Sequence, residues 1–112
     1  MITDALPPTT NFGAWTETVE FSDTEDNSLI DFSIYPEITL SVIDPYSQAH
    51  VLVLTKTRGQ ITTPSPGVIE WYVEMGVMNG LKPGPYDVRL VAQIDTAQNL
   101  LPLMRSSISV VS

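Results

Sequence analysis

The sequence contains no cysteine and only one histidine, His50, among its 112 residues. Without cysteine the chain cannot form a disulfide, use a thiolate as a nucleophile or build a cysteine-ligated zinc site. A single histidine also excludes a multi-histidine metal centre and the HExxH motif of metalloproteases. Disulfide-stapled, thiol-based and histidine-rich sites are therefore excluded by composition.

Long apolar runs are absent as well. The longest, residues 51–54, has four members, whereas a membrane-spanning helix needs about 20. The first residues show neither a basic region nor an apolar one, so no secretory signal is expected. The sequence does contain 43% hydrophobic residues, which suffice for one compact core in a chain of this length. We therefore expect one small domain.

Basic residues are scarce and unevenly placed. The net charge is −8, and residues 1–50 hold nine acidic residues and no Lys or Arg, while residues 51–112 hold four acidic and five basic residues. A nucleic-acid-binding protein needs a basic stripe against phosphates, so nucleic acid is excluded as a partner. An acidic surface also disfavours anionic membranes. The acidic half serves either solubility or contact with a basic partner surface.

Apolar and polar residues alternate along several short segments, as expected of β-strands with one buried face. The alternating segments are residues 15–21, 38–43, 68–75, 86–94 and 103–111. Residues 51–55 form a continuous apolar strand, which predicts burial on both faces. Residues 60–62 form a further short strand. About seven strands, with no long amphipathic helix, predict an all-β fold, namely an Ig-like antiparallel β-sandwich.

Turn and loop residues separate these strands. The turn signals are Asp44-Pro45, residues 64–67 and residues 81–85. Residues 22–28 and 95–99 are predicted loops, residues 29–32 are either a short strand or a plug at the core edge, and residues 76–80 suit one 3₁₀ turn. Tyr86 follows a Pro-Gly turn, so it is either a tyrosine corner, with its hydroxyl bonded to an upstream backbone group, or a plain core residue.

Residues 1–13 are predicted to be an extended N-terminal arm, and residues 14–112 the sandwich domain. Pro7-Pro8 favour polyproline II geometry, and we expect the arm to be disordered or laid along a neighbouring chain. The expected core comprises Ile38, Leu40, Val53, Trp71, Val73, Tyr86, Val88 and Leu90. The alternation leaves Ile43, Val68 and Val91 on outward positions, which indicates a surface for a partner.

No group of residues predicts catalysis, so the chain is expected not to be an enzyme, with no catalytic, cofactor-binding or metal-binding residues. His50 has no partner for chemistry and is interpreted as structural. The acids Asp23, Glu25 and Asp26 lack the spacing of a calcium loop. Glu70 and Glu74 share one strand face, which does not define a glycosidase cleft. The residues that could form a sugar-binding platform, or equally core and edge positions, are Trp15, Tyr35, Tyr46 and Tyr72.

The order of strands and turns resembles small all-β structural proteins of tailed bacteriophages and prophages, and is similar to the Ig-like N-terminal domain of phage upper baseplate proteins. The resemblance covers about residues 15–111. It rests on Glu37-Ile38-Thr39-Leu40, Asp44-Pro45, Gln60-Ile61-Thr62, Pro66-Gly67, Ile69-Glu70-Trp71, Leu81-Lys82-Pro83-Gly84-Pro85-Tyr86-Asp87-Val88 and Ile108-Ser109-Val110.

This resemblance implies a non-enzymatic virion protein, made in the host cytoplasm, that docks in the tail, baseplate or fibre attachment region. Its partners would be other virion proteins, in multiple copies or as a homo-oligomer, with no cofactor, nucleic acid or membrane involved. The alternatives are a capsid decoration protein of the same fold and a cellular module that binds carbohydrate or protein.

Overall fold

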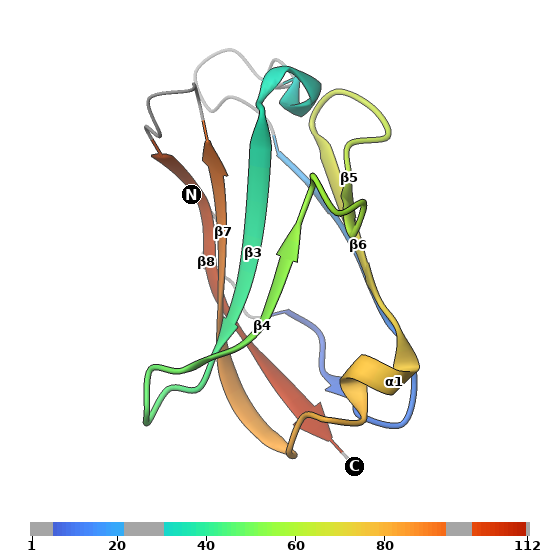
Figure 1. Cartoon of the computed structure of the whole chain (residues 1–112), viewed down its shortest axis with the longest axis vertical. Coiled ribbons are helices and arrows are strands. Elements are labelled where there is room, and N and C mark those ends of the chain that lie inside the picture. Colours follow the sequence, from blue (N-terminus) through green and yellow to red (C-terminus); the bar gives the residue numbers. More distant parts are fainter. Residues whose placement is uncertain (1–5, 22–30, 94–99, 112) are drawn as a thin grey trace.

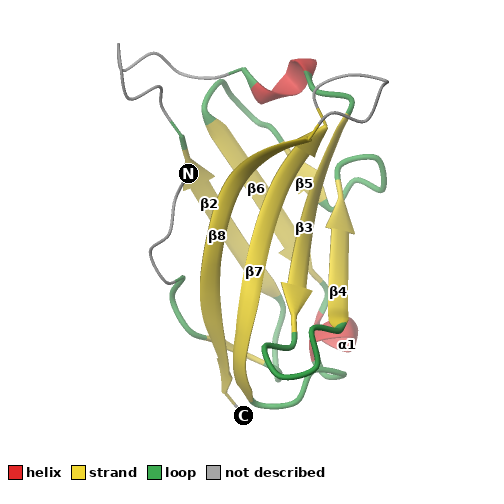
Figure 2. Ribbon diagram, turned by 90° about the vertical axis from the view of Figure 1, so that its left-hand side faces the viewer, coloured by secondary structure: helices red, strands yellow, loops and turns green. Residues whose placement is uncertain are grey.

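Two β-sheets face each other across one hydrophobic core in the computed structural model, which describes residues 6–21, 31–93 and 100–111 (Figures 1 and 2). The elements are β1 (Thr9–Thr10), β2 (Trp15–Glu20), the 3₁₀ helix η1 (Phe32–Ile34), β3 (Glu37–Ile43), β4 (His50–Thr55), β5 (Ile61–Thr62), β6 (Val68–Val73), α1 (Met75–Met78), β7 (Gly84–Gln93) and β8 (Leu100–Val111). The larger sheet has the strand order β1-β8-β7-β3-β4, and the smaller has β2-β6-β5. The predicted β-sandwich is confirmed.

The larger sheet is antiparallel except at β1, which runs parallel to β8. In β3 the alternation has the expected result, because Ile38, Leu40 and Val42 are buried between the sheets. Strand β7 is buried at every second residue from Tyr86 to Ala92. The register between β7 and β8 shifts between Leu90 and Val91, which leaves Leu103 of β8 without a partner on β7.

Trp71 of β6 lies at the centre of the smaller sheet's inner face and is 1% exposed. Its ring packs edge-on against Trp15 of β2, with 5.7 Å between ring centroids and 76° between planes, a favoured geometry for aromatic pairs. Phe32 of η1 is fully buried and contacts Phe21 in the same manner. Of the eight expected core residues, only Val53 is not buried.

Tyr86 forms the tyrosine corner that was one of its two predicted roles. Its hydroxyl donates a hydrogen bond of 2.6 Å to the carbonyl oxygen of Lys82, while its ring is buried in the core. The bond ties the turn before β7 to the start of that strand, and so fixes the direction in which β7 enters the larger sheet.

The N-terminal segment lies along the molecule's own β8. The Leu6 N–H donates to the carbonyl of Ser107 and the Asn11 N–H to that of Val111, while β1 pairs with the end of β8 between these points. Leu6 also packs against the core. The expectation that this segment is disordered or needs a neighbouring chain is therefore wrong for residues 6–11, because β8 offers a free edge.

Strand β4 is exposed on one side, contrary to the prediction that residues 51–55 are buried on both faces. It is the last strand of the larger sheet, and the side chains of Val51 and Val53 are 39% and 40% exposed. A continuous apolar run is compatible both with a strand covered by two layers and with an edge strand whose outer face is uncovered. The prediction of burial on both faces was wrong for this reason. Ile43 deviates in the opposite sense, because it is buried although an outward position was expected.

The remaining predictions concern connections. Residues 75–78 form one turn of α-helix where a 3₁₀ turn was expected. Phe32 plugs the core, which is one of the two readings of residues 29–32. The loops predicted at 22–28 and 95–99 lie outside the described residues. No helix within the described ranges is long and apolar enough to cross a bilayer.

Candidate functional site

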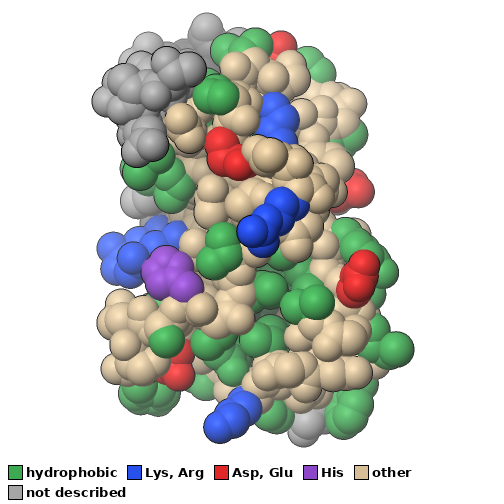
Figure 3. All heavy atoms as spheres, viewed as in Figure 1, with side chains coloured by type: hydrophobic (Ala, Val, Ile, Leu, Met, Phe, Trp, Pro, Cys, Tyr) green, Lys and Arg blue, Asp and Glu red, His purple; other side chains and the backbone are tan. Residues whose placement is uncertain are grey.

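The uncovered side of the sandwich between β4 and α1 is the candidate site, and we call it the open edge. It comprises the β4 residues Val51 and Val53, the turn residues Arg58 and Gln60, and Val77 of α1. Figure 1 views the molecule from this side, and Figure 3 shows hydrophobic side chains gathered in the hollow between the two sheets.

Val53 of β4 has backbone groups that do not pair with β3. The N–H of Lys56 donates to the carbonyl of Ile38 at 2.9 Å, and Leu40 lies opposite Leu54 in the same register. Because hydrogen-bonded pairs alternate in an antiparallel ladder, the backbone N–H and C=O of Val53 point away from β3. Neither group has a hydrogen-bond partner outside the ladder among the described residues.

Val51 interrupts the pairing of β4 with β3. The β3–β4 register shifts at this point, so that Val42 lies opposite Leu52 and Ile43 lies opposite His50. Val51 is skipped and has no partner on β3, as in a β-bulge. The outer edge of β4 thus presents the backbone groups of Val53, and the exposed apolar side chains of Val51 and Val53 lie beside them.

Gln60 closes one end of this edge. Its side-chain Oε1 accepts a hydrogen bond from the N–H of Thr55 at 3.2 Å, and its own N–H donates to the Thr55 carbonyl at 3.3 Å. Its carbonyl accepts from the N–H of Tyr72 in β6 at 3.1 Å. Gln60 therefore joins the two sheets and satisfies the outward backbone groups of Thr55, so the free edge begins at Val53.

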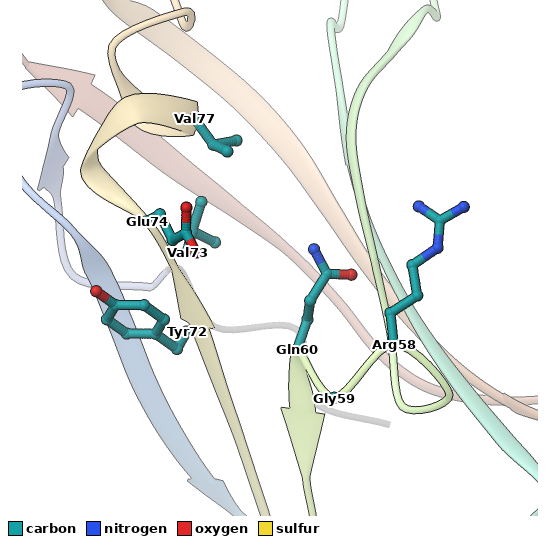
Figure 4. A pocket seen from close by; sticks show the side chains of 7 residues that line it. All are labelled: Arg58, Gly59, Gln60, Tyr72, Val73, Glu74 and Val77. Carbon is teal, nitrogen blue, oxygen red and sulfur yellow. The ribbon is translucent and has the colours of Figure 1, made fainter.

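A hollow of about 340 Å³ lies beside Gln60. It is lined by Arg58, Gly59, Gln60, Tyr72, Val73, Glu74 and Val77. Figure 4 shows the Gln60 amide between Arg58 on the β4–β5 turn and the Val73–Val77 segment, whereas the Tyr72 ring points away from it. Within the described ranges no ion pair joins Arg58 to Glu74, so both charges remain available to a bound molecule.

A second hollow, of about 380 Å³, lies at the other end of β4 and is lined in part by Val51, Leu81 and Tyr86. The two hollows flank the free segment of β4. An extended chain that pairs with Val53 would therefore find room at both ends of the strand for its own side chains.

The Glu37 carboxylate holds the start of β3 against the turn that follows β4. It accepts hydrogen bonds from the hydroxyl and the N–H of Thr57, and from the N–H of Ile38. Burial acts to raise the pKa of Glu37, but these hydrogen bonds outweigh it and the pKa lies below its ordinary value of 4.5. The carboxylate is thus a structural anchor of the turn that carries Arg58 and Gln60.

The residues singled out in the sequence do not converge on one site. His50 is exposed at the start of β4, and Glu70 accepts a hydrogen bond from the Thr18 hydroxyl on the outer face of the smaller sheet. Glu74 lies at the start of α1 and lines the hollow beside Gln60.

The four candidates for a sugar platform are separated in the same way. Trp15 is buried and Tyr35 packs against Phe32. Only Tyr46 and Tyr72 present exposed rings, from different elements. The acids Asp23, Glu25 and Asp26 lie outside the described residues, and among the described ones no group of three or more His, Asp or Glu side chains could hold a metal ion.

The open edge itself was missed in the sequence. One feature of the sequence could have indicated it: residues 51–55 come just before the Lys56–Gln60 turn, where the chain leaves the larger sheet for the smaller one.

Comparison with known proteins identifies the fold of this chain but not its family. No family model and no curated protein sequence matches the chain. Among solved structures it is similar to the crystal structure of CopC from Methylosinus trichosporium OB3b, with a TM-score of 0.50 and 11% identity, over 98% of this chain and 84% of that one. The chain is thus a β-sandwich with the overall arrangement of CopC.

This likeness corrects the expected resemblance to phage proteins. A solved structure that matches almost the full chain is CopC, which is not a virion protein, so the phage family, the tail, baseplate or capsid role and the virion location are wrong. The quoted motifs are short strand segments and turn or corner signals, such as Leu81 to Tyr86, and such features recur among Ig-like sandwiches. They therefore specify a fold and do not distinguish one family from another.

Proposed function

We propose that this chain is a non-catalytic module that binds an extended peptide segment by adding it as a strand beside β4. The observation that carries the proposal is the outward backbone N–H and C=O of Val53, next to the exposed apolar side chains of Val51 and Val53. Strand addition uses such groups for affinity and flanking pockets for specificity. The hollows beside Gln60 and Val51 would supply the pockets.

The edge has little of the protection that sheets use against unwanted pairing. Proteins block edge strands with lysine, proline or inward-pointing charges. Strand β4 reads His-Val-Leu-Val-Leu-Thr and holds no proline, no lysine and no acid. An uncharged, apolar edge that remains open is what a strand-accepting module requires.

The likeness to CopC raises a copper site as the alternative function. The residues present do not fit such a site. Copper sites use clustered imidazole, thiolate or thioether ligands. The sequence has no cysteine and one histidine, and Met78 and Met104 are buried in the apolar core. Met75 is exposed on α1, whereas His50 starts β4. The peptide-binding proposal needs no metal.

The test uses proline at position 53. Val53→Pro removes the outward N–H, while the bonds from β4 to β3 are made by Leu52, Leu54 and Lys56. Val53→Thr, which keeps the N–H and the branched shape, is the matched control. Decapeptides selected from a random display library against the intact chain are then measured by fluorescence polarisation.

We expect Val53→Thr to retain binding and Val53→Pro to weaken it at least tenfold, and the amide signals of Val51 and Val53 to shift in the nuclear magnetic resonance spectrum of the complex. Equal binding by both variants, or signal shifts confined to another surface, would contradict strand addition.

A further inference from the structure

Two arginines lie directly opposite each other on the outer face of the larger sheet. Arg89 of β7 is the register partner of Arg105 of β8, and these neighbouring strands are seen side by side in Figure 2. Like charges directly opposite on one face of a sheet are destabilising. The chain has only three arginines and a net charge of −8, so this pairing of two of them calls for a physical reason.

The acids on the same face do not neutralise the pair. Glu37 is engaged by Thr57 and Ile38. Asp87 lies two residues before Arg89 and opposite Ser107, and no ion pair links it to either arginine within the described ranges. Both guanidinium groups therefore keep their full donor capacity.

The arginines border a hollow with an apolar floor. It has a volume of about 360 Å³ and is lined by Arg89, Arg105, Val91, Pro102 and Met104. The register shift that follows Leu90 leaves Leu103 without a partner on β7, and this bulge locally bends the strands. Bulges often re-aim side chains next to functional sites, and here the bulge lies immediately beside the arginine pair.

We propose that the Arg89–Arg105 pair binds the carboxylate of a small organic acid whose apolar body lies in this hollow. A guanidinium group presents a planar fork that matches a carboxylate in bidentate fashion, and a ligand charge between the two forks replaces their repulsion by attraction. The hollow is in the size range of small-molecule sites, which are largely apolar with a few polar groups that fix orientation. This site lies on the sheet face and is separate from the open edge at β4.

Calorimetric titration with acetate, butyrate and hexanoate tests the assignment, with sodium chloride at equal ionic strength as the reference and inorganic phosphate as the competing oxyanion. We expect affinity to rise about three- to fourfold for each methylene that enters the hollow. Arg89→Gln and Arg105→Gln should each weaken hexanoate binding at least tenfold. Lys82→Gln removes an exposed charge at a distant turn and should leave binding unchanged.

Thermal unfolding gives a second, independent readout. Arg105→Gln should raise the melting temperature of the ligand-free protein, because it removes the repulsion, and hexanoate should raise the melting temperature of the original chain only.

Three results would overturn the proposal. The first is an equal loss of binding in Lys82→Gln. The second is phosphate binding as tight as that of hexanoate, without dependence on chain length. The third is a fall in melting temperature on Arg105→Gln together with no response to hexanoate, which would make the arginines structural.

Discussion

The hydroxyl of Tyr86 donates to the carbonyl oxygen of Lys82 across a tight turn, at 2.6 Å. The bond is formed at the point where the chain leaves α1 and enters β7, the strand with the most residues paired to its neighbours β3 and β8. A side chain that is buried at its ring and bonded at its tip fixes both the position and the direction of the strand it begins.

Tyr86→Phe should therefore lower the free energy of unfolding by about 1 kcal/mol, since the ring stays and one hydrogen bond is lost. Urea denaturation measures the change. Tyr72→Phe is the matched control, because that ring is 52% exposed, and it should leave stability unchanged. An equal loss in both variants would mean that the corner contributes nothing specific.

Trp71→Ala should be among the most damaging single changes. It removes a side chain that is 1% exposed and that packs edge-on against Trp15, at a cost of about 3–5 kcal/mol. The neighbouring Tyr72→Ala, on the outer face of the same strand, should cost only about 1 kcal/mol, because that ring is half exposed. Chemical denaturation followed by circular dichroism separates the two.

Truncation of residues 1–12 should destabilise the isolated chain. The truncation removes the packing of Leu6, the β1–β8 pairing and the hydrogen bond from the Asn11 amide to the Leu81 carbonyl. Leu6→Ala alone should cost about 1–2 kcal/mol, as expected for a partly buried leucine. If the truncated chain melts at the same temperature as the full one, the segment is not part of the sandwich.

Acid should weaken the anchor formed by Glu37. Because its pKa in the folded chain lies below the ordinary value of 4.5, its contribution to stability is fully present above that pH and is lost as pH falls through the folded pKa. Thermal unfolding between pH 7 and pH 3 should show a smaller acid-induced fall in melting temperature for Glu37→Gln than for the original chain. Identical falls would show that Glu37 is not responsible.

Hydrogen exchange distinguishes the two sides of β4 without any ligand. The amide of Val53 points outward and should exchange rapidly, whereas that of Leu54, bonded to β3 in the same register, should be protected. Equal protection of both amides would show that the edge is already occupied.

The sequence predicts most strands because their apolar residues recur with the period of a half-buried sheet. Ile38, Leu40 and Val42 illustrate this, since alternation alone locates their buried face. The Pro-Gly turn before Tyr86 likewise carries local geometry that any homologous turn must share. Such features are set by residues near one another in the chain.

The candidate sites escape prediction because they depend on which strands become neighbours. The residues from Val51 to Thr55 do not indicate that β4 is the last strand of the sheet. The alternation of apolar and polar residues in β7 and β8 does not indicate that Arg89 lies opposite Arg105. That pairing depends on the register and on a one-residue bulge. The turn motifs do not identify a family for a related reason, because such turns are common to the whole fold class.

The position of Gln60 limits the length of any added strand. Because its amide and backbone already occupy the outward groups of Thr55, an incoming chain can continue its ladder along β4 only as far as Val53. Gln60 therefore blocks further backbone pairing at Thr55 and sets the position at which an added strand must end. A peptide partner would thus pair with β4 over a short segment and in one register. A longer peptide would have to turn away from the sheet at Thr55.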